Sequence, residues 1–165
     1  EGVRIELLCG DRARRYLSAC WEQSLHIGQA LSVKPVASAA AVERLLTELG
    51  ALKLRCARLE EAAFAQTAAQ YENRGDVLLF EDEMSGDSLR KLCDAVTNRC
   101  GGRCAVFAGA DGAYKYAIGC AGGDLRELTK RMNAALSGRG GGKPNFVQGS
   151  VSCRRADIET FFTRN

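Results

Sequence analysis

The segment CAVFAGADGAYKYAI, residues 104–118, decides how the C-terminal part of this chain folds. Two apolar runs, residues 104–108 and 114–118, lie on either side of Asp111-Gly112. An Asp-Gly pair between apolar runs is a strong hairpin signal, because glycine accepts the positive φ angle that a tight hairpin turn requires. We therefore expect two adjacent antiparallel strands here.

The segments around this hairpin predict a small sheet covered by helices. Upstream, residues 77–80 form a short apolar run that is typical of a buried strand, and a helical pattern follows it. Downstream, we expect a helix over residues 124–136, a last strand near residues 145–151 and a short helix over about residues 156–162. This order of elements predicts an α/β fold of the α+β kind, with one mixed sheet and a glycine-rich loop near the C-terminus.

The N-terminal part of the chain has the pattern of two helices. Residues 11–31 carry apolar side chains at helical spacing. Pro35 interrupts this pattern, because proline lacks the donor that a helix interior needs. Ser38 is placed to cap a second helix, which ends before Gly75. A short proline turn between two helices predicts an antiparallel helical hairpin.

The second helix carries apolar residues at alternating intervals of three and four, which is the heptad pattern of a coiled coil. We call this set the leucine seam, and we expect the first helix, a second copy of the chain, or both to cover it. The seam consists of Val42, Leu45, Leu49, Leu52, Cys56, Leu59 and Ala63, and its candidate dimer contacts are Val42, Leu45, Leu49, Leu52 and Leu59.

The segment from Ser137 to Ser150 is the most unusual in the chain, because four of the five residues 138–142 are glycine. Ordering so many glycines is entropically costly, so such a run is rarely kept merely as a turn. Successive glycine amides can form an anion-binding nest, and two flanking cations would strengthen it. A flexible surface loop is the alternative. The candidate phosphate-binding residues are Arg139, Gly140, Gly141, Gly142, Lys143, Asn145 and Gln148.

The segment GRGGGKPNFVQG, residues 138–149, resembles the Gly-Gly-x-Pro-Asp/Asn-x-x-Gln-Gly signature of the DHH-associated domain. This domain closes alanyl-tRNA synthetases and the long stand-alone alanyl-tRNA editing proteins of the AlaX type, and it also follows the catalytic domain of DHH phosphoesterases. Residues 2–13 are similar to the strand that closes the editing domain and to the start of the helices after it. The resemblance implies a remnant strand over residues 1–10, a helical hairpin over 11–73 and a DHH-associated domain over 75–165.

The resemblance implies that the chain contacts tRNA, with alanine tRNA as the ligand in view of the family, and forms a homodimer through the helical hairpin. In that family, zinc in the editing domain is held by a His-x-x-x-His and a Cys-x-x-x-His pair. This sequence has neither pair, and His26 is its single histidine. We therefore expect no catalytic residue, metal or cofactor in this chain. Zinc and the aminoacyl-tRNA deacylase chemistry would belong to an upstream editing domain of a longer protein.

Composition and charge are compatible with this interpretation. Hydrophobic residues make up 46% of the chain, charged residues make up 26%, and the net charge is +3, with basic residues concentrated after residue 125. No apolar stretch is long enough to span a membrane. The eight cysteines form no Cys-x-x-Cys pair, so we expect reduced thiols in a cytoplasmic protein. Two alternatives stay open: the substrate-binding domain of a DHH-type phosphoesterase, and a purely structural dimerisation domain.

Overall fold

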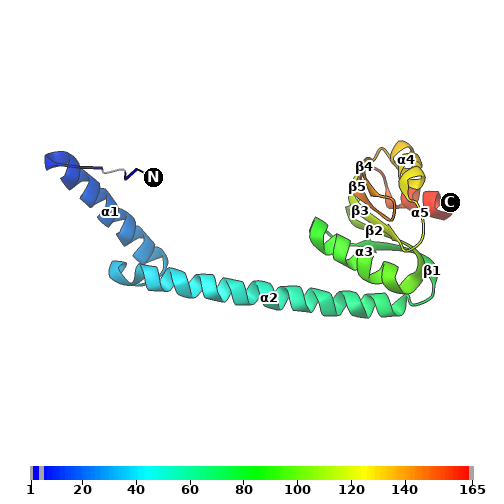
Figure 1. Ribbon diagram of the computed structural model, residues 1–165, viewed down its shortest axis with the longest axis horizontal. Helices are drawn as coiled ribbons and strands as arrows, with labels where there is room; N and C mark the ends of the chain where they lie inside the picture. The colour runs from blue at the N-terminus through cyan, green and yellow to red at the C-terminus, as the bar shows by residue number, and fades with distance from the viewer. Residues whose placement is uncertain (1, 4–5, 164–165) are drawn as a thin grey trace. The chain divides into compact units, whose positions relative to one another are not determined.

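The computed structural model describes residues 2–3 and 6–163 (Figure 1). The chain divides into two compact units, residues 1–56 and residues 57–165. The boundary between them lies within one long helix.

The first unit contains α1 (Gly10–Ala30), the 3-10 turn η1 (Pro35–Ala37) and the beginning of α2 (Ser38–Gln70). The two predicted helices are confirmed. The turn between them packs closely on α1, because a Cβ added at Gly28 would lie 2.8 Å from the Val33 carbonyl oxygen. Ser38 does not act as the predicted N-cap. It is the first residue of α2, and its hydroxyl donates a hydrogen bond to the Pro35 carbonyl oxygen at 2.8 Å.

Residues 2–3 and 6–9 form no strand, although the sequence predicted one there, and residues 4 and 5 of that prediction lie outside the described residues. A strand needs a neighbouring strand for its backbone hydrogen bonds. Within residues 2–3 and 6–163, every strand belongs to the sheet of the second unit.

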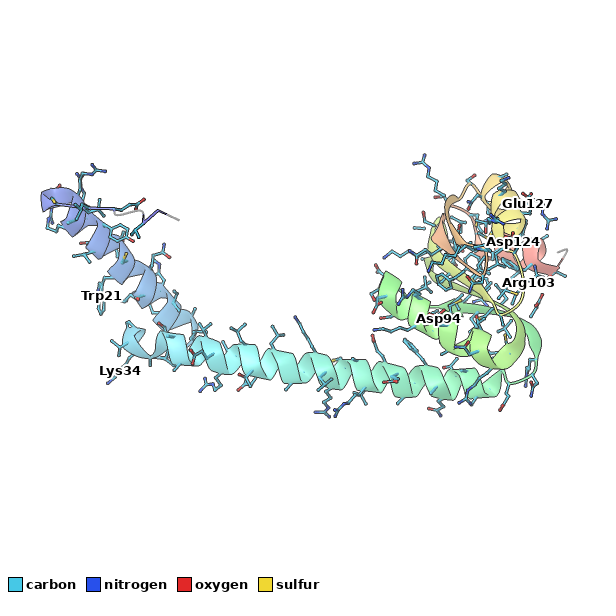
Figure 2. All side chains as sticks on the ribbon, viewed as in Figure 1. Trp21, Lys34, Asp94, Arg103, Asp124 and Glu127 are labelled. Carbon is cyan, nitrogen blue, oxygen red and sulfur yellow. The ribbon has the colours of Figure 1, made fainter. Side chains whose placement is uncertain are left out.

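The leucine seam on α2 is exposed in this structure. Val42 is 41% exposed, Leu52 is 57% exposed and Leu59 is 62% exposed. The expectation that the first helix covers the seam is therefore wrong for the single chain. On α1, Leu17 is exposed as well. Trp21 of the same helix, labelled in Figure 2, is also exposed.

The second unit is built on a five-stranded sheet with the order β1-β2-β3-β5-β4. β1 and β2 are parallel, whereas every other neighbouring pair is antiparallel. The predicted mixed sheet covered by helices is thereby confirmed. Its elements are β1 (Gly75–Glu81), α3 (Gly86–Cys100), β2 (Gly101–Ala110), β3 (Ala113–Cys120), α4 (Arg126–Ala135), β4 (Arg139–Lys143), β5 (Phe146–Val151) and α5 (Arg155–Thr163).

Two hydrophobic cores form on the two faces of this sheet because successive strand residues point to opposite sides. On β2, Val106 points into the core that α3 and the end of α2 cover, and Phe107 points into the core beneath α4 and α5. Both side chains are fully buried. The predicted hairpin at Asp111-Gly112 joins β2 to β3, with Gly112 at a φ of 88°.

The glycine-rich segment is an edge strand, β4, and not the loop that the sequence predicted. Gly140 pairs with Gly149 and Gly141 pairs with Gln148 across the β4–β5 hairpin. None of the glycines at 138 and 140–142, all of which are described, has the positive φ that an anion-binding nest requires. The physical reason is close packing: a Cβ at Gly140 would overlap the Gln148 carbonyl oxygen and the Tyr116 hydroxyl.

Alanine substitutions at neighbouring glycines test this arrangement. We expect Gly140→Ala to lower the free energy of unfolding by about 1–3 kcal/mol, because the new methyl group would push β4 away from the sheet. Gly141→Ala should change it by less than about 1 kcal/mol, since a Cβ there meets nothing within 4 Å. Urea unfolding of the two variants measures both values. Equal effects would mean that β4 does not pack on the sheet as described.

An ion pair joins the beginnings of β1 and β2. The Asp76 carboxylate accepts hydrogen bonds from the Arg103 backbone amide at 2.7 Å, from its Nε at 2.8 Å and from its Nη2 at 2.6 Å (Figure 2 labels Arg103). The bond from the Arg103 side chain is the main cause that lowers the pKa of Asp76 below its usual 3.8. A carboxyl group with a lowered pKa stabilises the fold above its unfolded-state pKa and loses that contribution as the pH falls through its folded-state pKa.

We expect Asp76→Asn to lower the free energy of unfolding by about 0.5–1 kcal/mol at pH ~7, a modest value because water screens a half-exposed pair. The difference from the unsubstituted protein should shrink at a second, acidic pH that lies below the lowered pKa of Asp76, where its carboxylate is protonated. Urea unfolding at the two pH values checks this. A difference that does not depend on pH would show that the charge of Asp76 is not what stabilises the fold.

Candidate nucleic-acid interface

A row of polar and basic side chains crosses the last three strands of the sheet. Ser150 on β5 lies opposite Lys115 on β3 and opposite Arg139 on β4. Directly opposed residues of antiparallel strands point to the same face. The three side chains therefore form one row on the face that also carries Ala117, which belongs to the core beneath α3.

Helix α3 covers β1, β2 and part of β3 on this face, and it leaves the polar row exposed. Two residues further along β4 and β5, Gly141 lies opposite Gln148 on the same face. After two more residues, Lys143 lies opposite Phe146. We call this surface the basic face. It consists of Lys115, Arg139, Gly141, Lys143, Gln148 and Ser150.

The three cations of the basic face have no acidic partner. Within residues 2–3 and 6–163, Lys115, Arg139 and Lys143 make no ion pair. Several cations on the other side of the sheet are paired, as Arg126 is with Asp124 at 2.6 Å and Lys130 is with Glu127 at 3.2 Å. Unpaired cations keep their full charge available for an anionic partner.

A cavity of about 300 Å³ lies beside the basic face, between the first turn of α3 and the sheet. Gly86 and Leu89 line it from the helix. Lys115, Gln148 and Gly149 line it from the strands. The side chains of Lys115 and Gln148 thus meet at one hollow, although they lie on different strands.

The edge strand that carries Arg139 and Lys143 is held from behind by Asn133 of α4. The Tyr116 hydroxyl donates to Asn133 Oδ1 at 3.2 Å, and Asn133 Nδ2 donates to the Gly140 carbonyl oxygen at 3.2 Å. Burial raises the pKa of Tyr116, so its hydroxyl stays protonated and can act as the donor. These hydrogen bonds lie on the side of the sheet opposite to the basic face, and they hold β4 in place from that side.

The structure separates the predicted phosphate-binding residues into three groups. Arg139, Gly141, Lys143 and Gln148 lie on the basic face, whereas Gly140 and Gly142 alternate to the opposite face. Asn145 is exposed in the turn between β4 and β5, and its carbonyl oxygen accepts a hydrogen bond from the Cys120 amide at 3.0 Å.

Sequence reasoning missed Lys115. Its signal was the alternation in residues 114–118, where Lys115 is the polar residue between Tyr114 and Tyr116. That alternation places Lys115 on the opposite face from the two tyrosines, but it does not reveal that β5 and β4 continue the same face.

The geometry suits contacts with several phosphates. Lys115 and Arg139 are separated by two strand spacings, about 10 Å, and Arg139 and Lys143 by four residues along β4, about 13 Å. Lysine and arginine bind phosphate oxygens through charge-assisted hydrogen bonds. Among the residues that the structure describes, no group of three or more His, Cys, Asp or Glu side chains could hold a metal ion.

A search of the described helices found none that is both long enough and apolar enough to span a membrane.

Comparison with known proteins identifies relatives of this fold. The DHHA1 domain matches residues 67–161. An alanine–tRNA ligase from Mycobacterium sp. (strain KMS) is 35% identical over 170 residues, which cover 89% of this chain and 18% of the ligase. The alanine–tRNA ligase from Mycobacterium tuberculosis (strain ATCC 25618 / H37Rv) is 33% identical over 170 residues, which again cover 89% of this chain and 18% of the ligase. The chain thus spans less than one fifth of the length of these relatives.

A solved structure is similar to part of the chain. It is the C-Ala domain of the Aquifex aeolicus alanyl-tRNA synthetase, which matches with a TM-score of 0.49 and 19% sequence identity. The match covers 56% of this chain and 91% of that domain.

Substitutions on the basic face should leave the fold intact. We expect Lys115→Gln, Arg139→Gln and Lys143→Gln each to change the free energy of unfolding by less than about 0.5 kcal/mol, because exposed side chains without ion pairs contribute little to stability. Thermal unfolding followed by circular dichroism checks this. A larger loss in any variant would assign that side chain a structural role.

Proposed function

Because this chain belongs to the DHHA1 domain family, we propose that it is a tRNA-binding module whose basic face contacts the phosphate backbone of a folded tRNA. The observation that carries the proposal is the set of unpaired cations, Lys115, Arg139 and Lys143, on the part of the sheet face that α3 leaves exposed. Phosphate contacts position a nucleic acid without reading its sequence.

The chemistry of each side chain supports phosphate binding. Arg139 offers the planar, forked donor that matches phosphate oxygens, and Lys115 and Lys143 supply point charges on flexible stems. Gln148 and Ser150 lie between the cations and can donate hydrogen bonds to phosphate or ribose oxygens. A face with this composition favours a folded backbone over a splayed single strand, because single-strand sites use exposed aromatic rings for stacking.

The similarity to alanine–tRNA ligases supports alanine tRNA as the ligand. In this proposal, the module serves a longer alanyl-tRNA synthetase or alanyl-tRNA editing protein, and the aminoacyl-tRNA chemistry is carried out outside residues 1–165. The protein works in the cytoplasm, where aminoacylated tRNA is used.

The exposed leucine seam supports a second role, the formation of a homodimer through α2. Leu45, Leu49 and Leu52 are each more than 40% exposed at heptad spacing. An apolar stripe of this length is costly in water and is a common feature of helices that pair with another helix.

A smaller phosphorylated ligand is the second candidate for the basic face. The cavity of about 300 Å³ beside Lys115 and Gln148 has the size of a small-ligand site. It would suit a nucleotide or a phosphorylated end, as in the substrate-binding domain of a DHH-type phosphoesterase.

A salt series with labelled alanine tRNA tests the main proposal. We expect the logarithm of the binding constant to fall against the logarithm of salt concentration with a slope of about −2 to −3, as three phosphate contacts predict. The combined variant Lys115→Gln, Arg139→Gln, Lys143→Gln should lose most of the affinity and most of this slope. Single variants should each reduce the slope by about one.

A matched control removes charge from the opposite side of the sheet. Arg126→Gln with Lys130→Gln should leave tRNA affinity nearly unchanged, because both side chains lie on α4 and already have acidic partners. An equal loss in this control would mean that total charge, and not the basic face, binds tRNA. A mononucleotide can be added as a competitor to the labelled tRNA. Displacement of the tRNA by a mononucleotide, at concentrations at which a polyanion of tRNA size does not displace it, would favour the small-ligand alternative.

A further inference from the structure

A groove between the last part of α2 and helix α3 has no role in the functions proposed above. Its cavity has a volume of about 620 Å³. The two helices lie side by side and run in the same direction. At one end, Glu60 of α2 accepts a hydrogen bond from the Ser88 hydroxyl in the first turn of α3. At the other end, the Asn73 amide just after α2 donates to the Arg99 carbonyl oxygen in the last turn of α3.

The floor of this groove is apolar and consists mainly of small side chains. Its apolar lining residues are Ala57, Phe64, Ala65, Ala68 and Ala95. Phe64 and Ala95 pack against the core beneath α3, and Ala68 belongs to that core. Because small side chains shorten the distance at which helices pack, the alanines leave room for another backbone to approach α2 and α3 closely. We call this surface the alanine groove.

Two carboxylates without ion pairs stand on opposite walls of the alanine groove. Glu61 lines it from α2, and Asp94, labelled in Figure 2, lines it from α3. In the described part of the chain, neither carboxylate makes an ion pair. Lys91 also lines the groove, but its ammonium is held by Asp87 at 2.6 Å. The walls therefore present negative charge that a cationic partner can pair with.

The far end of the alanine groove has the opposite charge. Asn98 and Arg99 line it there, in the last turn of α3. Arg99 lies about 7 Å beyond Asp94 along the helix axis, at 1.5 Å per residue. Among the residues that the structure describes, Arg99 makes no ion pair. The groove is thus negative along most of its length and positive where it ends.

We propose that the alanine groove is a docking site for an amphipathic helix of a partner protein, about three turns long, with basic side chains in its first two turns. The inference goes beyond the tRNA contact and the dimer role proposed above. It rests on the apolar floor, the helical walls and the order of the charges along the groove.

The walls of the groove decide that the occupant is a helix. Both walls are helices, whose interior N–H and C=O groups are bonded within each helix. An extended peptide in the groove would bury backbone groups that find no partner there, whereas a helix satisfies these groups internally. Residues 57–68 of α2 span about 16 Å, which is the length of three helical turns.

The order of charges decides the composition and the direction of the docked helix. Basic side chains on its flanks would pair with Glu61 and Asp94. A helix N-terminus carries partial positive charge and a C-terminus partial negative charge. The N-terminal end therefore fits beside Glu61, and the last carbonyl groups fit beside Asn98 and Arg99, which can donate hydrogen bonds to them. The partner helix runs in the same direction as α2 and α3.

The alanine groove and the leucine seam lie on different sides of α2. Successive residues of a helix are turned by about 100°. Glu61 and Ala65 each follow a seam residue, Leu59 and Ala63, by two positions, so they point about 160° away from it. A helix in the groove and a partner on the seam would therefore not compete for the same side chains.

A labelled synthetic peptide is the probe for this site, with fluorescence anisotropy as the measurement on the full chain. The peptide carries leucines at intervals of three and four, lysines beside them in the first two turns, and neutral side chains elsewhere. We expect saturable binding at micromolar concentrations. A peptide of the same composition with alternating leucines, the pattern of a strand, should bind at least about tenfold more weakly, because it cannot present one apolar helix face.

Ala65→Trp fills the groove without a change of charge. It should raise the dissociation constant of the peptide about tenfold or more, because the indole ring would occupy the space of the docked side chains. Ala51→Trp is the matched control, an exposed alanine of α2 that does not line the groove. Circular dichroism and tRNA affinity, which should stay unchanged in Ala65→Trp, verify that this variant is folded.

Reversal of the wall charges tests the order of charges. Glu61→Lys with Asp94→Lys should weaken binding of the lysine peptide about tenfold or more. The same double variant should bind a peptide with glutamates in place of the lysines to within about threefold of the original affinity. Glu22→Lys with Glu43→Lys makes an equal change of net charge in the first unit and should leave the affinity for the lysine peptide nearly unchanged.

Four results would overturn the proposal. The first is no saturable binding of the lysine peptide up to about 1 mM. The second is equal affinity of Ala65→Trp and Ala51→Trp for the peptide, which would place it elsewhere. The third is an equal loss in the charge-reversed variant and its control. The fourth is a change in self-association of the chain without peptide in Ala65→Trp, measured by sedimentation, which would mean that a second copy fills the groove. None of them affects the tRNA-binding role, which depends on the basic face.

Discussion

The close approach of β4 to β5 is the constraint on which the rest of the site depends. Gly140 and Gly149 face each other across the hairpin with no side chain between them, and Tyr116 lies directly behind. Asn133 then ties the Gly140 carbonyl oxygen to α4. Because a shift of one residue would turn every side chain of a strand to the other face, this locked register is what places Arg139 on the same face as Lys115 and in line with it across β5.

Local patterns were enough to predict most elements of the fold. The Asp111-Gly112 turn and the helical periodicities depend on neighbouring residues, and the structure confirms them. The glycine-rich segment was predicted as a loop because glycine's freedom fits a loop and a crowded strand equally well. The choice depends on Tyr116, which comes from another part of the sequence and would meet a side chain at Gly140. Lys115 was missed for the same reason, since only the pairing of β3 with β5 places it beside the other cations.

The two surfaces use different physical interactions and lie on different elements of the chain. The basic face has charge without partners, which suits a hydrated polyanion and weakens with salt. The leucine seam has apolar area without cover, which suits another helix and depends little on salt. The heptad spacing was predicted correctly from the sequence. The sequence did not predict that α1 leaves the seam exposed, because spacing identifies an apolar stripe and not the element that covers it. In the proposed module, contact with RNA and the pairing of two copies would use different side chains.

The most direct test of the tRNA-binding account is lysine reactivity measured by acetylation and mass spectrometry, with and without alanine tRNA. Lys115 and Lys143 lie on the basic face, and Lys130 lies on α4 with Glu127 as its partner. The account predicts that tRNA protects Lys115 and Lys143 together and leaves Lys130 as reactive as before. Protection of Lys130 with Lys115 and Lys143 still reactive would contradict it, because the tRNA would then lie on the other side of the sheet.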